Sequence, residues 1–257
     1  MKSILIVIAL VVSVLTISSC QKDITGEIIG GTDSTVTTGP DTINNSFLVK
    51  TYTEDLTTAA GDHYSGTFNL TYDTDGRIIS MLSTASAGDR FVYKYNSDNT
   101  YTMDLFNANV LSIHGVFYIN SINRVDSSMQ YNDTQDTTTG KFIYDVAGFL
   151  TQQKEYEISE GVTTLINTTN YTYDNTKNNI VETDKDSETK YEYYTDLPNN
   201  LSLGMVYFQR NANLPKTTTI TGEATLSHTY TFDSLKRVTS EKVTATTGDV
   251  LIRSYTY

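Results

Sequence analysis

Regular alternation of aromatic and polar residues predicts β-strands along most of the chain. Residues 68–72 read Phe-Asn-Leu-Thr-Tyr and residues 91–95 read Phe-Val-Tyr-Lys-Tyr, and the same alternation returns at 171–173 and 230–232. A period of two places every second side chain on the same face of a strand. Each stretch therefore predicts a strand with one aromatic face and one polar face.

A short phrase separates these strands and recurs with errors. In the copy from Tyr72 to Ile78, Asp73 can accept a hydrogen bond from its own backbone two residues on, and Gly76 accepts the left-handed conformation of a hairpin loop. Each copy therefore predicts a β-hairpin turn, and residues 208–214 fit a further, decayed copy. The copies are anchored at Asp73, Asn96, Asn120, Asp145, Asp174 and Asp233.

The number of hairpins predicts the architecture. Two strands per hairpin, a strand at 47–54 and a last strand ending at Tyr257 give about sixteen antiparallel strands, above the usual size of an open sheet. Such a sheet must curl or close. The predicted fold is all-β, a large meander of hairpins rolled or closed into a barrel, with residues 47–257 as a single domain and no convincing helix.

The first residues have the pattern of a lipoprotein signal. Lys2 precedes an apolar segment from Ile4 to Ile17, which is shorter than the about 20 residues of a membrane-spanning helix. The end of this segment, Ile-Ser-Ser-Cys at 17–20, resembles the lipobox, whose cysteine is acylated and becomes the first mature residue. The resemblance implies a signal peptide at 1–19 and a lipid on Cys20 that makes a membrane the partner. A secretory signal with an incidental cysteine is the alternative.

The segment after the cysteine predicts a spacer. Residues 20–46 are rich in Gly, Thr and Ser without a sustained hydrophobic period, which is typical of a flexible tether, although a first strand through Ile28-Ile29 is the alternative. Residues 21–23, Gln-Lys-Asp, resemble the short signal that sends Bacteroidetes lipoproteins to the cell surface. We therefore expect a lipid-anchored protein of the outer membrane, exposed on the surface.

The turn phrase also resembles the Tyr-Asp repeats of Rhs-type bacterial surface proteins. The copy at 72–78 keeps Tyr, Asp, Gly and Arg together, and the likeness extends over most of residues 64–257. Together with the lipobox and the tether, it makes the chain similar to a family of uncharacterised Bacteroidetes lipoproteins described as having a porin-like fold. That resemblance implies a porin-like barrel and brings no catalytic residues with it.

Charge restricts the classes of possible partner, and the cysteine content restricts the possible crosslinks. The chain has 18 Lys and Arg against 30 Asp and Glu, a net charge of −12, with the acids scattered singly. Nucleic acid and anionic lipid both need a basic surface, so the acidic balance argues against either as a partner. Because Cys20 is the only cysteine, the chain has no intramolecular disulfide.

The sequence contains few groups with recognisable chemistry. His63, His114 and His228 are isolated, and no metal-binding or nucleophile motif surrounds them. Residues 73–76 resemble the start of a calcium loop but lack its later ligands, so a turn is the better interpretation. The acids Asp184, Asp186 and Glu188 could accept a calcium ion, yet a solvated edge is favoured. We expect no cofactor, no metal ion and no enzymatic activity.

Three tyrosines are candidates for ligand binding. The chain has 19 Tyr and no Trp, and most Tyr belong to the aromatic strand face. Tyr118, Tyr194 and Tyr207 each lie beside another ring or apolar residue of that face, so they should point away from it. Exposed rings can bind sugars, whereas ordinary cross-strand pairing is the alternative.

These observations predict a surface or outer-membrane lipoprotein that acts as a noncatalytic binding or structural module, with a glycan as the candidate ligand. An envelope scaffold or adhesion protein with a protein partner is the first alternative, and a hydrolase without a recognisable motif is the second. If the aromatic face met lipid instead of the interior, the chain would be an integral porin.

Overall fold

The computed structural model describes residues 48–86, 88–132, 137–201 and 211–257. The predicted signal peptide, Cys20, the whole tether and Tyr207 lie outside these ranges. The described residues form strands and turns, and none of their elements is a helix long and apolar enough to cross a membrane.

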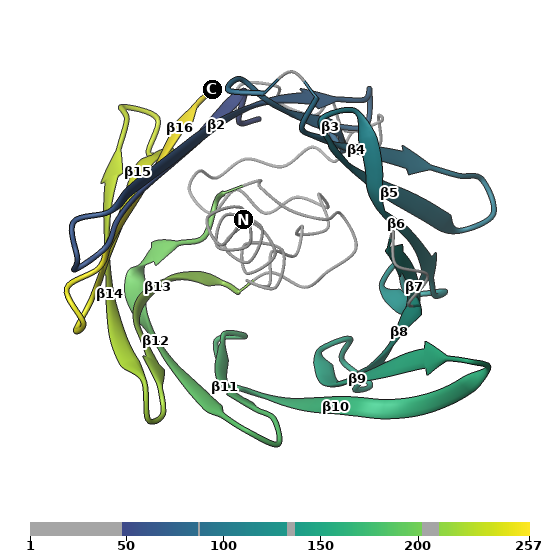
Figure 1. Cartoon of the computed structure of the whole chain (residues 1–257). Coiled ribbons are helices and arrows are strands. Elements are labelled where there is room, and N and C mark those ends of the chain that lie inside the picture. Colours follow the sequence, from purple (N-terminus) through teal and green to yellow (C-terminus); the bar gives the residue numbers. More distant parts are fainter. Residues whose placement is uncertain (1–47, 87, 133–136, 202–210) are drawn as a thin grey trace, which may run out of the picture.

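The strands form one closed antiparallel barrel in which each strand pairs with its neighbours in the sequence (Figure 1). β1 closes the ring by pairing with β16 as well as with β2. The prediction of an all-β fold of about sixteen strands is confirmed. The strands are β1 (Thr51–Thr57), β2 (His63–Tyr72), β3 (Ile78–Ser83), β4 (Arg90–Tyr95), β5 (Thr100–Asn107), β6 (Val110–Ile119), β7 (Val125–Asn132), β8 (Thr137–Tyr144), β9 (Leu150–Ser159), β10 (Val162–Tyr173), β11 (Asn179–Thr183), β12 (Glu188–Pro198), β13 (Asn213–Ile220), β14 (Ala224–Phe232), β15 (Val238–Ala245) and β16 (Val250–Thr256).

The six anchored turns lie at one end of the barrel, which we call the proximal rim. Because the strands alternate in direction, this end also contains the start of β1 and the end of β16, where Thr51 pairs with Thr256. The other end is the distal rim. The proximal turns are residues 73–77, 96–100, 120–124, 145–149, 174–178 and 233–237.

The anchor residue shapes each of these turns as the sequence predicted. The Asp73 carboxylate accepts hydrogen bonds from the backbone N–H groups of Asp75 and Arg77, both at 2.9 Å. Gly76 has a φ of 70°, which glycine adopts without steric cost. Asn120, Asp145, Asp174 and Asp233 accept the same pair of bonds in their own turns.

Four tyrosine hydroxyls each join one hairpin to the hairpin before it, and two of these tyrosines, Tyr95 and Tyr144, stand directly before an anchor residue. The Tyr95 hydroxyl at the end of β4 donates to the Ile78 carbonyl at the start of β3, at 2.9 Å. Tyr144, Tyr193 and Tyr257 make the equivalent bond to the first residue of β7, β11 and β15. The repeated aromatic residues therefore fasten neighbouring hairpins together along the proximal rim.

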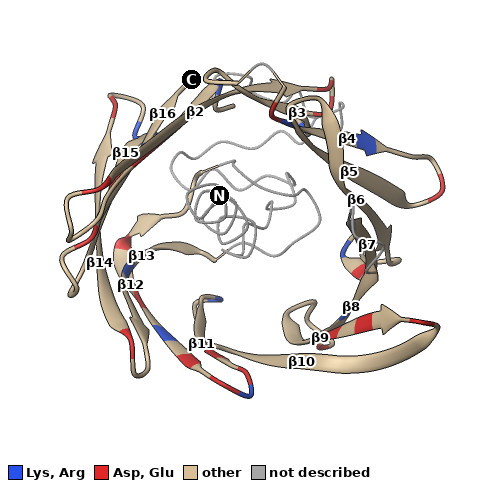
Figure 2. Ribbon diagram, viewed as in Figure 1, with Lys and Arg blue, Asp and Glu red and all other residues tan. Residues whose placement is uncertain are grey.

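The two faces of the barrel wall differ in polarity. A single closed sheet has no second layer outside it, so the buried side chains are those on its inner face. There Tyr101 is 1% exposed and stacks on Phe117 with ring centroids 4.5 Å apart. The outer face has cross-strand threonine pairs such as Thr53 with Thr67, whose hydroxyl oxygens are 3.0 Å apart. Acidic and basic residues are spread around the ring instead of gathered on one arc (Figure 2).

Candidate functional site

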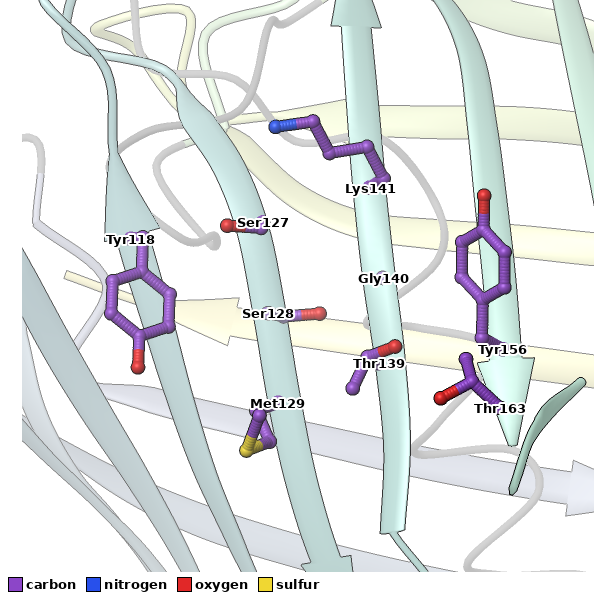
Figure 3. A pocket seen from close by; sticks show the side chains of 9 residues that line it. All are labelled: Tyr118, Ser127, Ser128, Met129, Thr139, Gly140, Lys141, Tyr156 and Thr163. Carbon is purple, nitrogen blue, oxygen red and sulfur yellow. The ribbon is translucent and has the colours of Figure 1, made fainter. Parts of the chain in front are cut away.

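The outer wall of the barrel is hollowed where β6 to β10 lie side by side. This hollow, the outer trough, has a volume of about 370 Å³ and is open to solvent. Tyr118 and Tyr156 stand on either side of β7 and β8, which supply the floor between them (Figure 3). The trough is lined by Tyr118, Ser127, Ser128, Met129, Thr139, Gly140, Lys141, Tyr156 and Thr163.

Strand register brings these side chains together. Ser127 on β7 pairs with Tyr118 on β6 and with Lys141 on β8, and Thr139 on β8 pairs with Tyr156 on β9. Directly paired residues project from the same face of a sheet. Neighbouring strands are about 4.8 Å apart, so the backbones that carry the two tyrosines are about 14 Å apart.

The lining groups suit a ligand that presents both an apolar face and hydroxyl groups. Tyr118 is 44% exposed, whereas the adjacent Phe117 is 3% exposed, so Tyr118 points outward as the sequence predicted. The rings can contact the faces of a sugar, and the floor offers the hydroxyls of Ser127 and Thr139. The Lys141 ammonium group is held by Asp126 at 2.6 Å on the same wall. Ring faces beside a few polar groups are typical of small-ligand sites.

Tyr156 was missed by sequence reasoning. It lies between two glutamates, Glu155 and Glu157, with no adjacent ring to reveal its phase. Only the pairing of β9 with β8 shows that it shares a face with Thr139.

Tyr194 does not point outward, so the predicted orientation of this ring is wrong. Its hydroxyl donates to the His228 carbonyl at 2.9 Å, and its ring meets Tyr230 edge-on with centroids 6.1 Å apart. The register of β12 against β13 shifts between Tyr193 and Pro198, which ends the strict alternation of faces. Tyr207 lies outside the described residues. Of the three predicted rings, the structure therefore places Tyr118 alone in the trough.

A chain of buried charged side chains crosses the inner face from β1 to β13. Arg253 contacts Glu54 at 3.2 Å and Glu241 at 2.9 Å. His228 Nδ1 lies 2.8 Å from the other Glu241 oxygen, and its Nε2 lies 3.1 Å from the Thr218 hydroxyl. We call these five residues the inner network. All of them are less than 10% exposed.

The surroundings of Glu241 and Arg253 favour the charged forms of these two side chains. Burial alone would raise the pKa of Glu241, but the hydrogen bond with His228 and the charge of Arg253 lower it to about 2. Burial opposes the charge on Arg253, yet the nearby carboxylate of Glu241 raises the pKa of the guanidinium. Thr218, His228 and Glu241 thus place a hydroxyl, an imidazole and a carboxylate in the order that also occurs in hydrolase triads. Here the Glu241 oxygen that faces His228 accepts a further bond from Tyr230, at 3.0 Å.

The two other histidines also pair with carboxylates across strands. His63 lies 2.7 Å from Asp55, and His114 lies 2.5 Å from Asp104. Sequence reasoning treated the histidines as isolated because each partner is on a neighbouring strand.

The acids considered as calcium ligands form turns. The Asp184 carboxylate accepts the backbone N–H groups of Asp186 and Ser187, and these bonds lower its pKa. Asp75 pairs with Arg77 at 2.9 Å. Across the part of the chain that the structure describes, no three His, Cys, Asp or Glu residues are arranged to hold a metal ion.

Glu182 is a half-buried carboxyl on the inner face of the wall. It pairs with Tyr171 across β10 and β11 and accepts a bond from the Asn179 amide at 2.6 Å. Burial outweighs the hydrogen bonds from Tyr191 and Asn179 and raises the pKa of Glu182 to about 7.

Comparison with known proteins supports the fold. The chain is similar to a porin-like protein from Bacteroides uniformis, with a TM-score of 0.62 and 13% identity over 81% of this chain and 97% of that one. It is also similar to a porin-like protein from Bacteroides vulgatus, with a TM-score of 0.53 and 16% identity over 81% and 98%. The predicted porin-like barrel is thereby confirmed. The sequence matches no protein-family profile and no curated protein.

Proposed function

We propose that this protein is an outer-membrane lipoprotein whose water-exposed barrel binds glycans, without catalysis, in the outer trough. The placement of Tyr118 and Tyr156 on either side of a hydroxyl-bearing floor is the observation that carries this proposal. The likeness of the barrel to porin-like proteins supports a role in the cell envelope.

The outer wall supports exposure of the barrel to water. A barrel embedded in lipid needs an outward apolar band about 25 Å tall. Here the outward positions of β1 are Thr51, Thr53, Asp55 and Thr57, and Lys94, Lys190 and Lys242 are exposed on other strands. A lipid on Cys20 would then hold the protein at the membrane, as the lipobox predicts.

The position of the inner network supports a noncatalytic role. A hydrolase needs a nucleophile that substrate can reach, and the Thr218 side chain is only 9% exposed. The other four residues of the inner network connect the adjacent strands β14, β15, β16 and β1 along the inner face of the wall. We therefore propose that these charged residues stabilise the barrel.

Glycan binding by paired variants tests the proposal. The double substitution Tyr118→Ala and Tyr156→Ala should leave the fold intact: the exposed Tyr118 site should change the free energy of unfolding by less than about 0.5 kcal/mol, and the half-buried Tyr156 site by about 1 kcal/mol. A ring stacked on a planar ligand contributes about 1 to 3 kcal/mol, so losing two rings should weaken binding at least about tenfold. Phe232→Ala is the matched control, because this ring is 38% exposed and lies on β14, outside the trough.

Two outcomes on a glycan array would contradict the proposal. The first is a wild-type protein that binds no glycan. The second is a double variant that binds as tightly as the wild type. Equal weakening by Phe232→Ala would show that the loss does not come from the trough.

A further inference from the structure

The two rims of the barrel carry different charge. Among the described turns, the proximal rim has five Lys and Arg against six Asp. The distal rim has one Lys against seven Asp and Glu, in turns 58–62, 84–86 with 88–89, 108–109, 160–161, 184–187, 221–223 and 246–249. Most of the excess negative charge of the turns is therefore at the distal end.

Two proximal acids are already neutralised by neighbouring arginines. Asp73 and Asp233 pair with Arg77 and Arg237 at 2.7 and 2.6 Å. The exposed lysines Lys177 and Lys236 stand at the left-handed positions of their turns, with φ of 72° and 60°.

Apolar side chains project from the tips of three proximal turns. Val146 is fully exposed, Ile122 is 53% exposed and Leu235 is 56% exposed. Ile122 and Val146 belong to neighbouring turns, since the end of the Ile122 side chain lies 3.8 Å from the position that a side chain at Gly148 would take. Contiguous exposed apolar groups mark contact surfaces, and Ile122 and Val146 supply such groups on neighbouring turns.

The path of the chain brings the same rim toward the N-terminal segment. The Lys50 N–H donates to the Thr256 carbonyl at 2.7 Å, and the Tyr72 hydroxyl donates to the Val49 carbonyl at 2.6 Å. Residues 49 and 50 are thus fixed at the proximal rim. The described chain therefore enters β1 from the proximal rim.

We propose that the proximal rim rests on the surface of the phospholipid bilayer that anchors the chain, with Ile122, Val146 and Leu235 in the headgroup region. This inference rests on the proposed lipid at Cys20. An anionic surface attracts Lys and Arg within about a Debye length and repels the acidic distal rim. Exposed Val110 and Val162 show that the distal rim has apolar residues too, so charge and chain path decide the orientation.

Single-tryptophan variants test this orientation without background, because the chain contains no Trp. The full lipidated protein is reconstituted in vesicles of phosphatidylethanolamine and phosphatidylglycerol, with and without brominated acyl chains. We expect the emission of Val146→Trp and Leu235→Trp to shift to shorter wavelength and to be quenched by brominated lipid. The matched control Val110→Trp, 66% exposed at the distal rim, should show neither effect.

The opposite results overturn the proposal. Equal quenching of Val110→Trp, or no quenching in any variant of a vesicle-bound protein, would show that the proximal rim does not face the bilayer. A protein that does not sediment with vesicles would instead contradict the proposed lipid on Cys20. Sedimentation therefore distinguishes a failure of the anchor from a failure of the proposed orientation.

A charge exchange tests the electrostatic part. Lys177→Glu with Lys236→Glu should reduce the quenching of Val146→Trp, whereas Lys185→Glu at the distal rim should leave it unchanged. An equal change in the quenching of Val146→Trp from the proximal double variant and from Lys185→Glu would contradict the role of charge.

Discussion

Among single residues, Arg253 links the two buried carboxylates of the inner network. It lies between two carboxylates, Glu54 and Glu241, on either side of β16. Buried ion pairs contribute little net stability when intact, but removal of one partner leaves an uncompensated charge in a medium that solvates it poorly.

Arg253→Met should therefore destabilise the barrel by about 3 to 5 kcal/mol. The matched control is Lys141→Met, which breaks the exposed pair with Asp126 and should cost less than about 1 kcal/mol. Urea unfolding of both variants measures the difference. If Arg253→Met and Lys141→Met lose the same free energy of unfolding, the inner network is not an isolated buried cluster.

The pH dependence of the free energy of unfolding should reflect the ionisation of the Glu182 carboxyl. Its pKa rises from an ordinary 4.5 to about 7 on folding, because burial disfavours the carboxylate. The folded state therefore binds the proton more tightly, so this stabilisation is complete below pH 4.5 and is lost as the pH rises through 7. A tenfold change in proton affinity corresponds to about 1.4 kcal/mol of free energy. The loss of unfolding free energy is therefore at most about 3 kcal/mol.

Glu182→Gln should remove that loss, so the variant should keep its stability between pH 5 and 8 while the wild type loses it. Below pH 4.5 the two curves should run parallel, and both should fall as Glu241, with its lowered pKa, is protonated between pH 4.5 and about 2. Unfolding free energies across this range provide the measurement. A wild-type curve that is flat from pH 5 to 8 would contradict the assignment.

At the level of elements, the proximal turn is the unit that repeats. One carboxylate or amide fixes two backbone N–H groups, and the residue three positions after the anchor takes a positive φ at Gly76, Asn99, Asn123, Gly148, Lys177 and Lys236. Each turn is bonded chiefly to its own strands, and four of the six are followed by a residue that accepts a bond from a neighbouring tyrosine, so damage to one turn should stay local.

Gly76→Val should cost about 1 to 2 kcal/mol, since a β-branched residue is strained at this positive φ. Ala147→Val in the turn after β8 is the control, because Ala147 is exposed and has no positive φ. Thermal unfolding should show a lower midpoint for the first variant alone, with the fold retained in both. Global unfolding by Gly76→Val would contradict a locally stabilised turn.

Strands and proximal turns could be predicted from the sequence because their signals are local. Period-two alternation identifies the strands, and an Asp or Asn anchor identifies the turns, with Gly or Asn three residues later in four of the six. The inner network could not be predicted, because Glu54 and Arg253 meet only when β1 closes the barrel against β16. Tyr194 was misplaced for a related reason: a register shift between β12 and β13 changes the face, and no pattern within β12 reveals it.

Over the whole molecule, the two faces of the wall and the two rims have separate proposed roles. The inner face buries the aromatic residues and the charged network, the outer face presents the trough, and the proximal rim faces the membrane. All three proposals require a barrel surrounded by water and held by a lipid. An integral porin would instead present its outer wall to lipid.

Release from the membrane tests this account most directly. Residues 1–19 are replaced by a cleavable secretory signal and Cys20 by Ala, so that neither a lipid nor an uncleaved signal can hold the chain. We expect a folded barrel in the soluble fraction, with a β-sheet circular dichroism spectrum like that of the lipidated protein. A folded barrel that remains in the membrane and needs detergent for extraction would contradict the account.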